Sequence, residues 1–168
     1  EHVDGPLLIL AGPGSGKTYT IARIILLLKT LAEGAPHAIR LAAPTGKAAA
    51  RLQETVEKAM RECVVGGRAA RTGASAASHP ACTLHRLLGY SPASGRFAYG
   101  PDNFLPADAV IVDEASMIDL EVMAALIRAL APSARLILVG DKDQLASVEA
   151  GALLGDMCSG IRAARRSG

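Results

Sequence analysis

A glycine-rich stretch near the start of the chain has the composition of a phosphate-binding loop: AGPGSGKT, residues 11–18. Glycines leave backbone N–H groups free to surround phosphate oxygens, and Lys17 can reach the β- and γ-phosphates of a nucleotide. The hydroxyl of Thr18 can hold Mg²⁺. Ala11 replaces the first glycine of the usual pattern, but it stands at a strand end, farthest from the phosphates. We therefore expect a working loop, made by Gly12, Pro13, Gly14, Ser15, Gly16, Lys17 and Thr18.

Two acidic residues follow an apolar stretch in AVIVDEAS, residues 109–116. Adjacent acids are commonly no more than a solvated turn. At the end of an apolar strand, in a chain that also has a phosphate loop, a catalytic role is favoured. Asp113 would then bind Mg²⁺ through water, and Glu114 could orient and deprotonate an attacking water.

A third polar segment, VGDKDQL at residues 139–145, follows another apolar run. Ligands of open α/β sheets bind at the carboxyl ends of the strands, where this segment would lie. The Gln144 amide could sense a γ-phosphate or the attacking water, and Asp141 or Asp143 could tie it to Glu114 or to the metal. As an isolated pattern GDxDQ is more often a polar turn, so the catalytic interpretation depends on its position after a strand.

Hydroxyl and cationic side chains occur in two further segments, PTGKAA (44–49) and TLHRLL (83–88). Hydroxyls, positive charges and helix N-termini are the groups that hold a sugar–phosphate backbone. His85 could instead be a structural histidine, and PTGK could be a helix cap followed by a solvated lysine. The candidates for nucleic-acid contact are Thr45, Lys47, Thr83, His85 and Arg86.

The charge distribution gives weaker support for a polyanion partner. The formal net charge is +2, yet the section from Lys58 to Arg96 holds six basic residues and one acidic residue, a local balance of +5. A basic section of this kind is compatible with nucleic acid, and equally with a solvated arginine-rich loop. Aromatic side chains for base stacking are scarce in this region; they are Tyr90, Phe97, Tyr99 and Phe104.

Four short apolar runs predict buried strands at residues 7–10, 39–43, 109–112 and 136–139. Strands that are apolar on both faces and alternate with helices predict a parallel sheet covered by helices. The expected fold class is therefore α/β, with a mostly parallel sheet flanked by helices on both faces.

Apolar residues at helical spacing predict the helices that should cover this sheet. One begins at Lys17 and ends near Glu33, and a second spans about 45–63 with Thr45 as its N-cap. Residues 66–81 and 91–106 lack a period and predict a mobile loop and a turn-rich segment. Further helices are expected at residues 83–88, along the stripe Leu120, Met123, Ala124, Ile127 and Leu130, and from Gly151 onward, before a frayed tail at 162–168.

The 168 residues are enough for one domain with a substantial core. A membrane span and a secretory signal are not expected, because no apolar run of about 18 residues and no basic N-terminal region is present. Cys63, Cys82 and Cys158 lack a C-x-x-C spacing. They are expected to be reduced, mostly buried thiols, which favours a cytoplasmic protein.

Taken in order, five blocks resemble the motifs of superfamily 1 DNA helicases. AGPGSGKT, LAAPTGKAAARL, TLHRLLG, VDEASMIDL and GDKDQLASVEAGALLGD are similar to motifs I, Ia, Ib, II and III, most closely in the RecD family of exodeoxyribonuclease V α subunits. The resemblance covers about residues 7–158 and is weakest in 64–81. It implies a P-loop NTPase fold with a RecA-like motor domain that uses ATP and Mg²⁺ to move 5′→3′ along single-stranded DNA.

The same resemblance implies roles for individual residues. It implies Lys17, Glu114 and Gln144 as catalytic residues, and Thr18 and Asp113 as metal ligands. It also implies DNA contacts at Pro44, Thr45, Lys47, Thr83 and His85. The implied partners are RecB and RecC, in double-strand break repair and recombination, and nothing in the chain resembles a nuclease site.

The chain also departs from the family pattern. RecD relatives usually have glycine where Ala11 stands. One motor domain is expected at residues 1–161. The adenine-reading glutamine segment and the second RecA-like domain, with its arginines for the γ-phosphate, are expected to be missing. An arginine finger is worth about 10³–10⁵ in rate, so the isolated chain is expected to bind ATP weakly with little turnover.

Two other function classes remain open at this point. A different P-loop enzyme, such as a nucleotide kinase, would need an arginine-bearing lid, for which Arg68 and Arg71 are the candidates. The other is a non-enzymatic nucleotide-binding interaction module.

Overall fold

A single parallel sheet forms the centre of the computed structural model, which describes residues 7–10, 17–31, 38–65 and 80–140. All four pairings between neighbouring strands are parallel, in the order β1-β5-β4-β2-β3. The strands are β1 (Leu7–Leu10), β2 (Ile39–Ala43), β3 (Ala81–Thr83), β4 (Ala109–Val112) and β5 (Arg135–Gly140).

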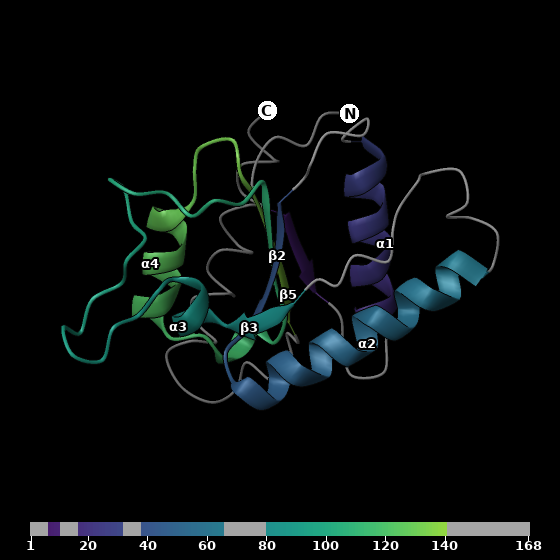
Figure 1. Cartoon of the computed structure of the whole chain (residues 1–168), viewed down its shortest axis with the longest axis horizontal. Coiled ribbons are helices and arrows are strands. Elements are labelled where there is room, and N and C mark those ends of the chain that lie inside the picture. The colour runs from purple at the N-terminus through teal and green to yellow at the C-terminus, as the bar shows by residue number, and fades with distance from the viewer. Residues whose placement is uncertain (1–6, 11–16, 32–37, 66–79, 141–168) are drawn as a thin grey trace.

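Helices cover both faces of this sheet, as Figure 1 shows. On one face lie α1 (Lys17–Leu31) and α2 (Gly46–Val65), and on the other lie α3 (Leu84–Leu87) and α4 (Leu120–Ala129). A short 3₁₀ turn, η1 (Ala115–Met117), joins β4 to α4. The α/β architecture with helices on both faces, expected from the sequence, is confirmed.

The core consists of two apolar layers that the sheet separates. Every residue of β4 is buried, and successive side chains enter opposite layers because a strand alternates its faces. Ile111 packs with α1 and α2, whereas Val110 and Val112 pack with α3 and α4. A strand buried on both faces explains why this run carries no polar side chain before Asp113.

Side-chain caps fix where the helices on the sheet edge begin. The Thr45 hydroxyl accepts a hydrogen bond from the Ala48 N–H at 3.2 Å, which confirms Thr45 as the cap of α2. The Asp119 carboxylate caps α4 by accepting from the Val122 N–H at 2.8 Å. Such caps satisfy backbone N–H groups that a helix leaves without an internal acceptor.

One strand was not expected from the sequence. Ala81 and Thr83 were assigned to a loop and a helix, but residues 81–83 form β3, paired with β2 in the register Ala42↔Cys82. α3 consequently begins at Leu84, and Thr83 is its N-cap rather than a helical residue. Three residues carry no periodicity of their own, so pairing with β2 defines the strand.

The apolar stripe predicted for α4 identifies the helix but not its buried face. Leu120 and Ile127 are 60% and 48% exposed. The predicted helix is confirmed. Because α4 is apolar around most of its circumference, the spacing alone does not identify the face that packs on the sheet. The residues that enter the core are Val122, Met123, Ala125, Leu126 and Ala129.

The remaining differences concern boundaries. α1 ends at Leu31, α2 continues to Val65, and β5 runs from Arg135 to Gly140. Residues 91–106 contain turns and two isolated bridges, as expected. Most of the loop expected at 66–81, namely residues 66–79, lies outside the described residues, as do the helix expected from Gly151 and the tail at 162–168. Within the part that the structure describes, no helix is long and apolar enough to cross a membrane.

Candidate functional site

The parallel sheet brings the carboxyl ends of its strands to one edge. Val112 pairs in register with Ala42 and with Leu138, and Leu10 pairs with Gly140. The turns that follow β2, β3 and β4 therefore open on the same edge of the sheet. The acidic pair and both polar segments predicted to contact DNA lie in these turns.

Asp113 is the first residue after β4 and is partly buried. Its backbone N–H donates to the carbonyl of Ala42 at 3.0 Å, which holds the turn after β4 against the end of β2. Its Oδ1 accepts a hydrogen bond from the Glu114 N–H at 2.9 Å. The Asp113 backbone is therefore held against β2, and its carboxylate is held by the N–H of the next residue.

Glu114 has an unusual backbone conformation. Its φ of 53° and ψ of 39° are left-handed, and no other non-glycine residue in the described ranges has a positive φ. This conformation costs an L-residue about 1–2 kcal/mol. The Glu114 Oε2 atom is buried and has no hydrogen-bond partner within the described part of the chain. A strained backbone that holds an unpaired carboxylate oxygen is typical of a functional site.

These two carboxylates suit a hydrated magnesium ion. Mg²⁺ prefers oxygen ligands and keeps several of its waters, so one carboxylate beside a second, unpaired oxygen acceptor fits its chemistry. The orphaned Glu114 Oε2 is the atom that such a water could satisfy. This geometry is compatible with the predicted chemistry, and the roles of Asp113 and Glu114 stay predictions.

Gly140 links the end of β5 to this turn. A Cβ atom at Gly140 would lie 3.3 Å from the backbone N of Ser116 and 3.7 Å from the Cβ of Ala115. The backbone of β5 therefore approaches η1 so closely that a side chain at Gly140 would fit only if η1 shifted slightly. Ser116 is itself buried, and its hydroxyl has no partner within the described ranges.

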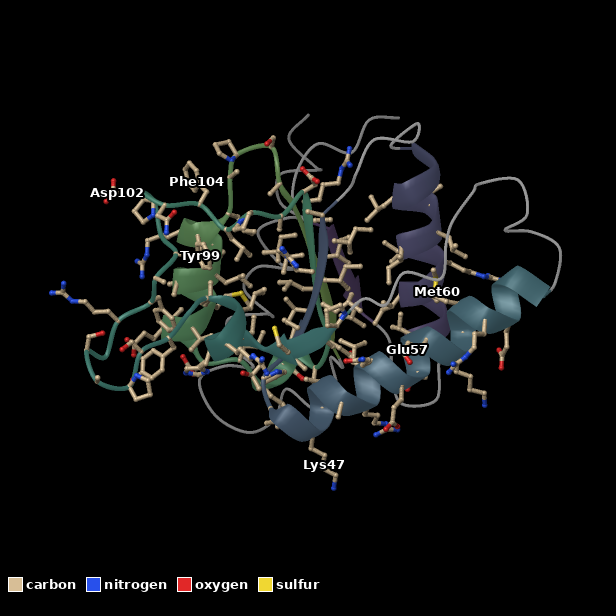
Figure 2. The ribbon with its side chains drawn as sticks, viewed as in Figure 1. Lys47, Glu57, Met60, Tyr99, Asp102 and Phe104 are labelled. Atoms are coloured by element: carbon tan, nitrogen blue, oxygen red, sulfur yellow. The ribbon has the colours of Figure 1, made fainter. Side chains whose placement is uncertain are left out.

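The turn after β2 presents Thr45 and Lys47 to solvent. Both residues are exposed and Pro44 is partly buried. Figure 2 shows Lys47 at the start of α2 with its side chain directed away from the body of the molecule. The Thr45 hydroxyl caps α2, so the helix cap followed by an exposed lysine, the alternative to nucleic-acid contact for PTGK, is present. Contact of these residues with DNA stays a prediction.

The turn after β3 presents a second group of polar residues. The Thr83 hydroxyl accepts from the Arg86 N–H at 3.3 Å, and His85 and Arg86 are exposed. The exposure of His85 leaves both interpretations open, a structural histidine and a contact for nucleic acid. The side chains predicted to contact DNA thus come from two neighbouring strand ends, those of β2 and β3.

Sequence reasoning did not find an aromatic cluster beside His85. The His85 and Tyr90 rings meet edge-on with centroids 5.2 Å apart, and Tyr90 and Phe97 lie 5.3 Å apart. Tyr90 is 39% exposed. Aromatic faces of this kind can stack on bases. The spacing of the three residues gives no signal, because the turn-rich segment from Gly89 onward brings Phe97 back to α3.

A cysteine lies close to this group but is not an activated nucleophile. Burial raises the pKa of the Cys82 thiol, and the positive charges of Arg86 and Arg40 only partly oppose this effect. The protonated thiol is the unreactive form. Cys82 is half-buried rather than fully buried, whereas Cys63 and Cys158 have no described side chain.

Several predicted site residues lie outside the described residues. α1 begins at Lys17, and its first turn contains no acidic residue that would repel an anion. The side chains of Lys17 and Thr18 are not described. The roles of all candidate site residues stay predictions. Those that lie outside the described residues are Gly12, Pro13, Gly14, Ser15, Gly16, Arg68, Arg71, Asp141, Asp143 and Gln144.

Comparison with curated proteins identifies long relatives that share this segment. The RecBCD enzyme subunit RecD of Mycolicibacterium smegmatis is 50% identical over 161 residues, which are 94% of this chain and 28% of that protein. The RecBCD enzyme subunit RecD of Haemophilus influenzae is 47% identical over 150 residues, 89% of this chain and 23% of that protein. The ATP-dependent RecD2 DNA helicase of Deinococcus radiodurans is 39% identical over 145 residues, 86% of this chain and 16% of that protein. The chain thus spans about a quarter or less of the length of these relatives.

A solved structure shares the fold without close sequence similarity. The ATPase domain of a Thermus phage large terminase superposes with a TM-score of 0.51 at 15% identity, covering 83% of this chain and 60% of that chain. The likeness is one of fold alone, and it agrees with the α/β P-loop NTPase architecture predicted from the sequence. The sequence model of the AAA domain family matches residues 2–150. Since this match covers most of the chain, the protein belongs to the AAA domain family.

Proposed function

We propose that this chain is the ATP-binding motor domain of a 5′→3′ DNA helicase of the RecD type. The observation that carries the proposal is the turn after β4. There Asp113 is held by backbone hydrogen bonds, and Glu114 adopts a left-handed conformation with a buried carboxylate oxygen that has no hydrogen-bond partner among the described residues. The similarity of most of this chain to relatives named as RecD subunits and as an ATP-dependent RecD2 DNA helicase supports the same assignment.

The geometry supports a division of labour along the sheet edge. Asp113 would hold Mg²⁺ together with Thr18, and bound Mg²⁺ would neutralise charge on the β- and γ-phosphates of ATP. Glu114 would orient the attacking water and accept its proton. Lys17 and the loop at 12–16 would bind the phosphates, and Gln144 would sense the γ-phosphate.

The DNA side of the proposal rests on the turns after β2 and β3. Lys47 and Arg86 supply exposed positive charge, and the capped N-termini of α2 and α3 face the same edge. The phosphates of single-stranded DNA would contact these groups together with Pro44, Thr45 and Thr83. The rings of His85, Tyr90 and Phe97 would supply a face for bases.

We propose that the chain is part of a longer protein, and that the other groups needed for ATP hydrolysis come from that protein. The proposed partners are RecB and RecC. The proposed process is double-strand break repair and recombination, and the proposed compartment is the cytoplasm. The 168 residues, with the motor domain at 1–161, are then expected to bind ATP weakly with little turnover. The arginine that completes such a site is worth about 10³–10⁵ in rate.

The test is ATP hydrolysis with and without single-stranded DNA, measured on the longer protein and on the 168-residue chain. We expect DNA to stimulate hydrolysis by the longer protein and unwinding from a 5′ overhang but not from a 3′ overhang. Robust turnover by the isolated chain would instead indicate that two copies complete one site. Failure of the longer protein to bind ATP would refute the proposal.

A further inference from the structure

Gly140 stands where three parts of the candidate site meet. It is the last residue of β5, and it pairs in register with Leu10, the last residue of β1. The predicted phosphate loop follows Leu10 in the sequence. Gly140 also lies against η1, because a Cβ atom there would be 3.3 Å from the Ser116 backbone N and 3.7 Å from the Ala115 backbone N. Gly140 therefore links the strand that leads to the phosphate loop with the turn that carries Glu114.

The contact between Gly140 and η1 has no room for a side chain. The atom nearest to an added Cβ is a backbone nitrogen, which cannot rotate away as the end of a long side chain could. The contact would be relieved only if one of the two segments moved by a few tenths of an ångström. β5 has little freedom to move, because it is paired with β1 on one side and with β4 on the other. The displacement would therefore fall mainly on η1.

Movement of η1 would be transmitted to Glu114. The Met117 N–H donates to the Glu114 carbonyl at 3.0 Å, and this bond closes the turn at whose start Glu114 stands. Within the residues that the structure describes, no side chain caps η1 and the Ser116 hydroxyl has no partner. The position of the turn therefore depends on packing, in which Ala115 enters the core and Gly140 supports the backbone from β5.

We propose that Gly140 is a positioning residue for Glu114. Because Gly140 has no side chain, β5 supports η1 directly, and this contact keeps the Glu114 carboxylate in place relative to a nucleotide bound by the loop after β1. A general base acts only within about 2.6–3.2 Å of the group whose proton it accepts, so a small displacement of Glu114 lowers the rate of the chemical step. The catalytic part of this inference rests on the proposed function, whereas the contact itself is a feature of the fold.

Steady-state ATP hydrolysis by the longer protein, with single-stranded DNA present, tests this role in the variant Gly140→Ala. Misplacing a catalytic group by about 1 Å can cost about 10²-fold in rate, so for a smaller shift we expect kcat to fall at least about fivefold. The KM for ATP should stay within about twofold, because the phosphate-binding residues are unchanged. Gly100→Ala is the matched control, since a Cβ at Gly100 would have nothing within 4 Å. Equal kcat values in the two variants, or a rise in KM that accounts for the whole loss of kcat/KM, would overturn the proposal.

Urea denaturation tests the link between Gly140 and Glu114 without any nucleotide. The substitution Glu114→Gly relaxes the left-handed turn, so that η1 can yield more easily to a side chain at Gly140. We expect Gly140→Ala to lower the denaturation midpoint about half as much or less in the Glu114→Gly background as in the unsubstituted chain, because residues that act on one another have non-additive effects. Equal shifts in the two backgrounds would show that Gly140 does not act on Glu114 and would overturn the proposal.

The two measurements separate this proposal from the proposed function. If Gly140→Ala alone does not fold, recovery of folding in combination with Glu114→Gly would support the proposal, and failure of both variants to fold would overturn it. If the unsubstituted longer protein does not hydrolyse ATP, the proposed function fails. The denaturation midpoints then still decide whether Gly140 controls the position of the Glu114 turn.

Discussion

The turns after β2 and β4 follow neighbouring strands but differ in how their polar groups are satisfied. In the turn after β2, Thr45 uses its hydroxyl to satisfy a helix N–H, and Lys47 extends into solvent. In the turn after β4, Glu114 adopts a costly left-handed conformation, and its buried Oε2 has no partner in the part of the chain that the structure describes. A turn that satisfies its own polar groups serves stability and surface contact, whereas one that leaves an acceptor unsatisfied is organised for a ligand.

The largest expected effect tests the turn after β4. Glu114→Gln keeps the shape of the side chain but removes the base, so kcat for DNA-stimulated ATP hydrolysis by the longer protein should fall about 10²–10⁴-fold. ATP affinity should change little. The matched control is Glu121→Gln on the charged face of α4, which should be neutral. Equal loss of ATP binding and kcat would contradict a role confined to the chemical step.

The next effect tests the turn after β2. Lys47→Ala should weaken single-stranded DNA binding by several-fold and lower the salt slope of binding by about 0.7, the value for one phosphate contact on a single strand. Binding can be titrated by fluorescence anisotropy over a range of salt concentrations. Lys58→Ala, which removes an exposed cation farther along α2, provides the control. If the two variants weaken binding equally, Lys47 has no specific contact.

The cap of α2 should affect stability more than chemistry. Thr45→Ala removes the acceptor for the Ala48 N–H and should lower the free energy of unfolding by about 1 kcal/mol. Urea denaturation measures this change. Thr55→Ala is the comparison, because the Thr55 hydroxyl donates to the Arg51 carbonyl within α2 and caps nothing. A loss of the same size in Thr55→Ala would show that capping is not the cause.

The smallest expected effect concerns backbone strain. Glu114→Gly should raise the free energy of unfolding by up to about 1 kcal/mol, because glycine adopts the left-handed conformation without penalty. The same variant should lose ATP hydrolysis. Gly89→Ala is the opposite case: Gly89 has a φ of +67°, and a Cβ there would lie 2.8 Å from the Ala98 Cβ. The Gly89→Ala variant should therefore be destabilised. Stabilisation of both variants would show that left-handed backbone strain does not determine the change in stability.

The sequence predicted the fold where local pattern and tertiary environment agree. β2 and β4 are apolar runs because they are buried on both faces, and Thr45 ends one run with a cap whose chemistry is local. β3 could not be predicted, because its pairing with β2 joins residues such as Leu41 and Ala81, which are far apart in sequence. The buried face of α4 was likewise decided by the sheet beneath it and not by its own spacing.

The site shows the same division between local and non-local information. The positions of Asp113 and Glu114 after β4 follow directly from the apolar run before them. The conformation of Glu114 could not be predicted, because the sequence of that turn does not indicate a left-handed residue. The aromatic cluster at His85 also escaped prediction, since a turn-rich segment has no period from which the return of Phe97 to α3 could be inferred.

The short strand β3 has a consequence for how the protein behaves in concentrated solution. Among the described strands it forms one edge of the sheet and is three residues long. The N–H of Ala81 is already bonded to the Gln53 side chain of α2 at 3.3 Å. An exposed sheet edge invites strands of other molecules to add to it, and short or covered edges prevent this. β3 thus ends the sheet in a form that offers little template for self-association or fibril growth at this boundary.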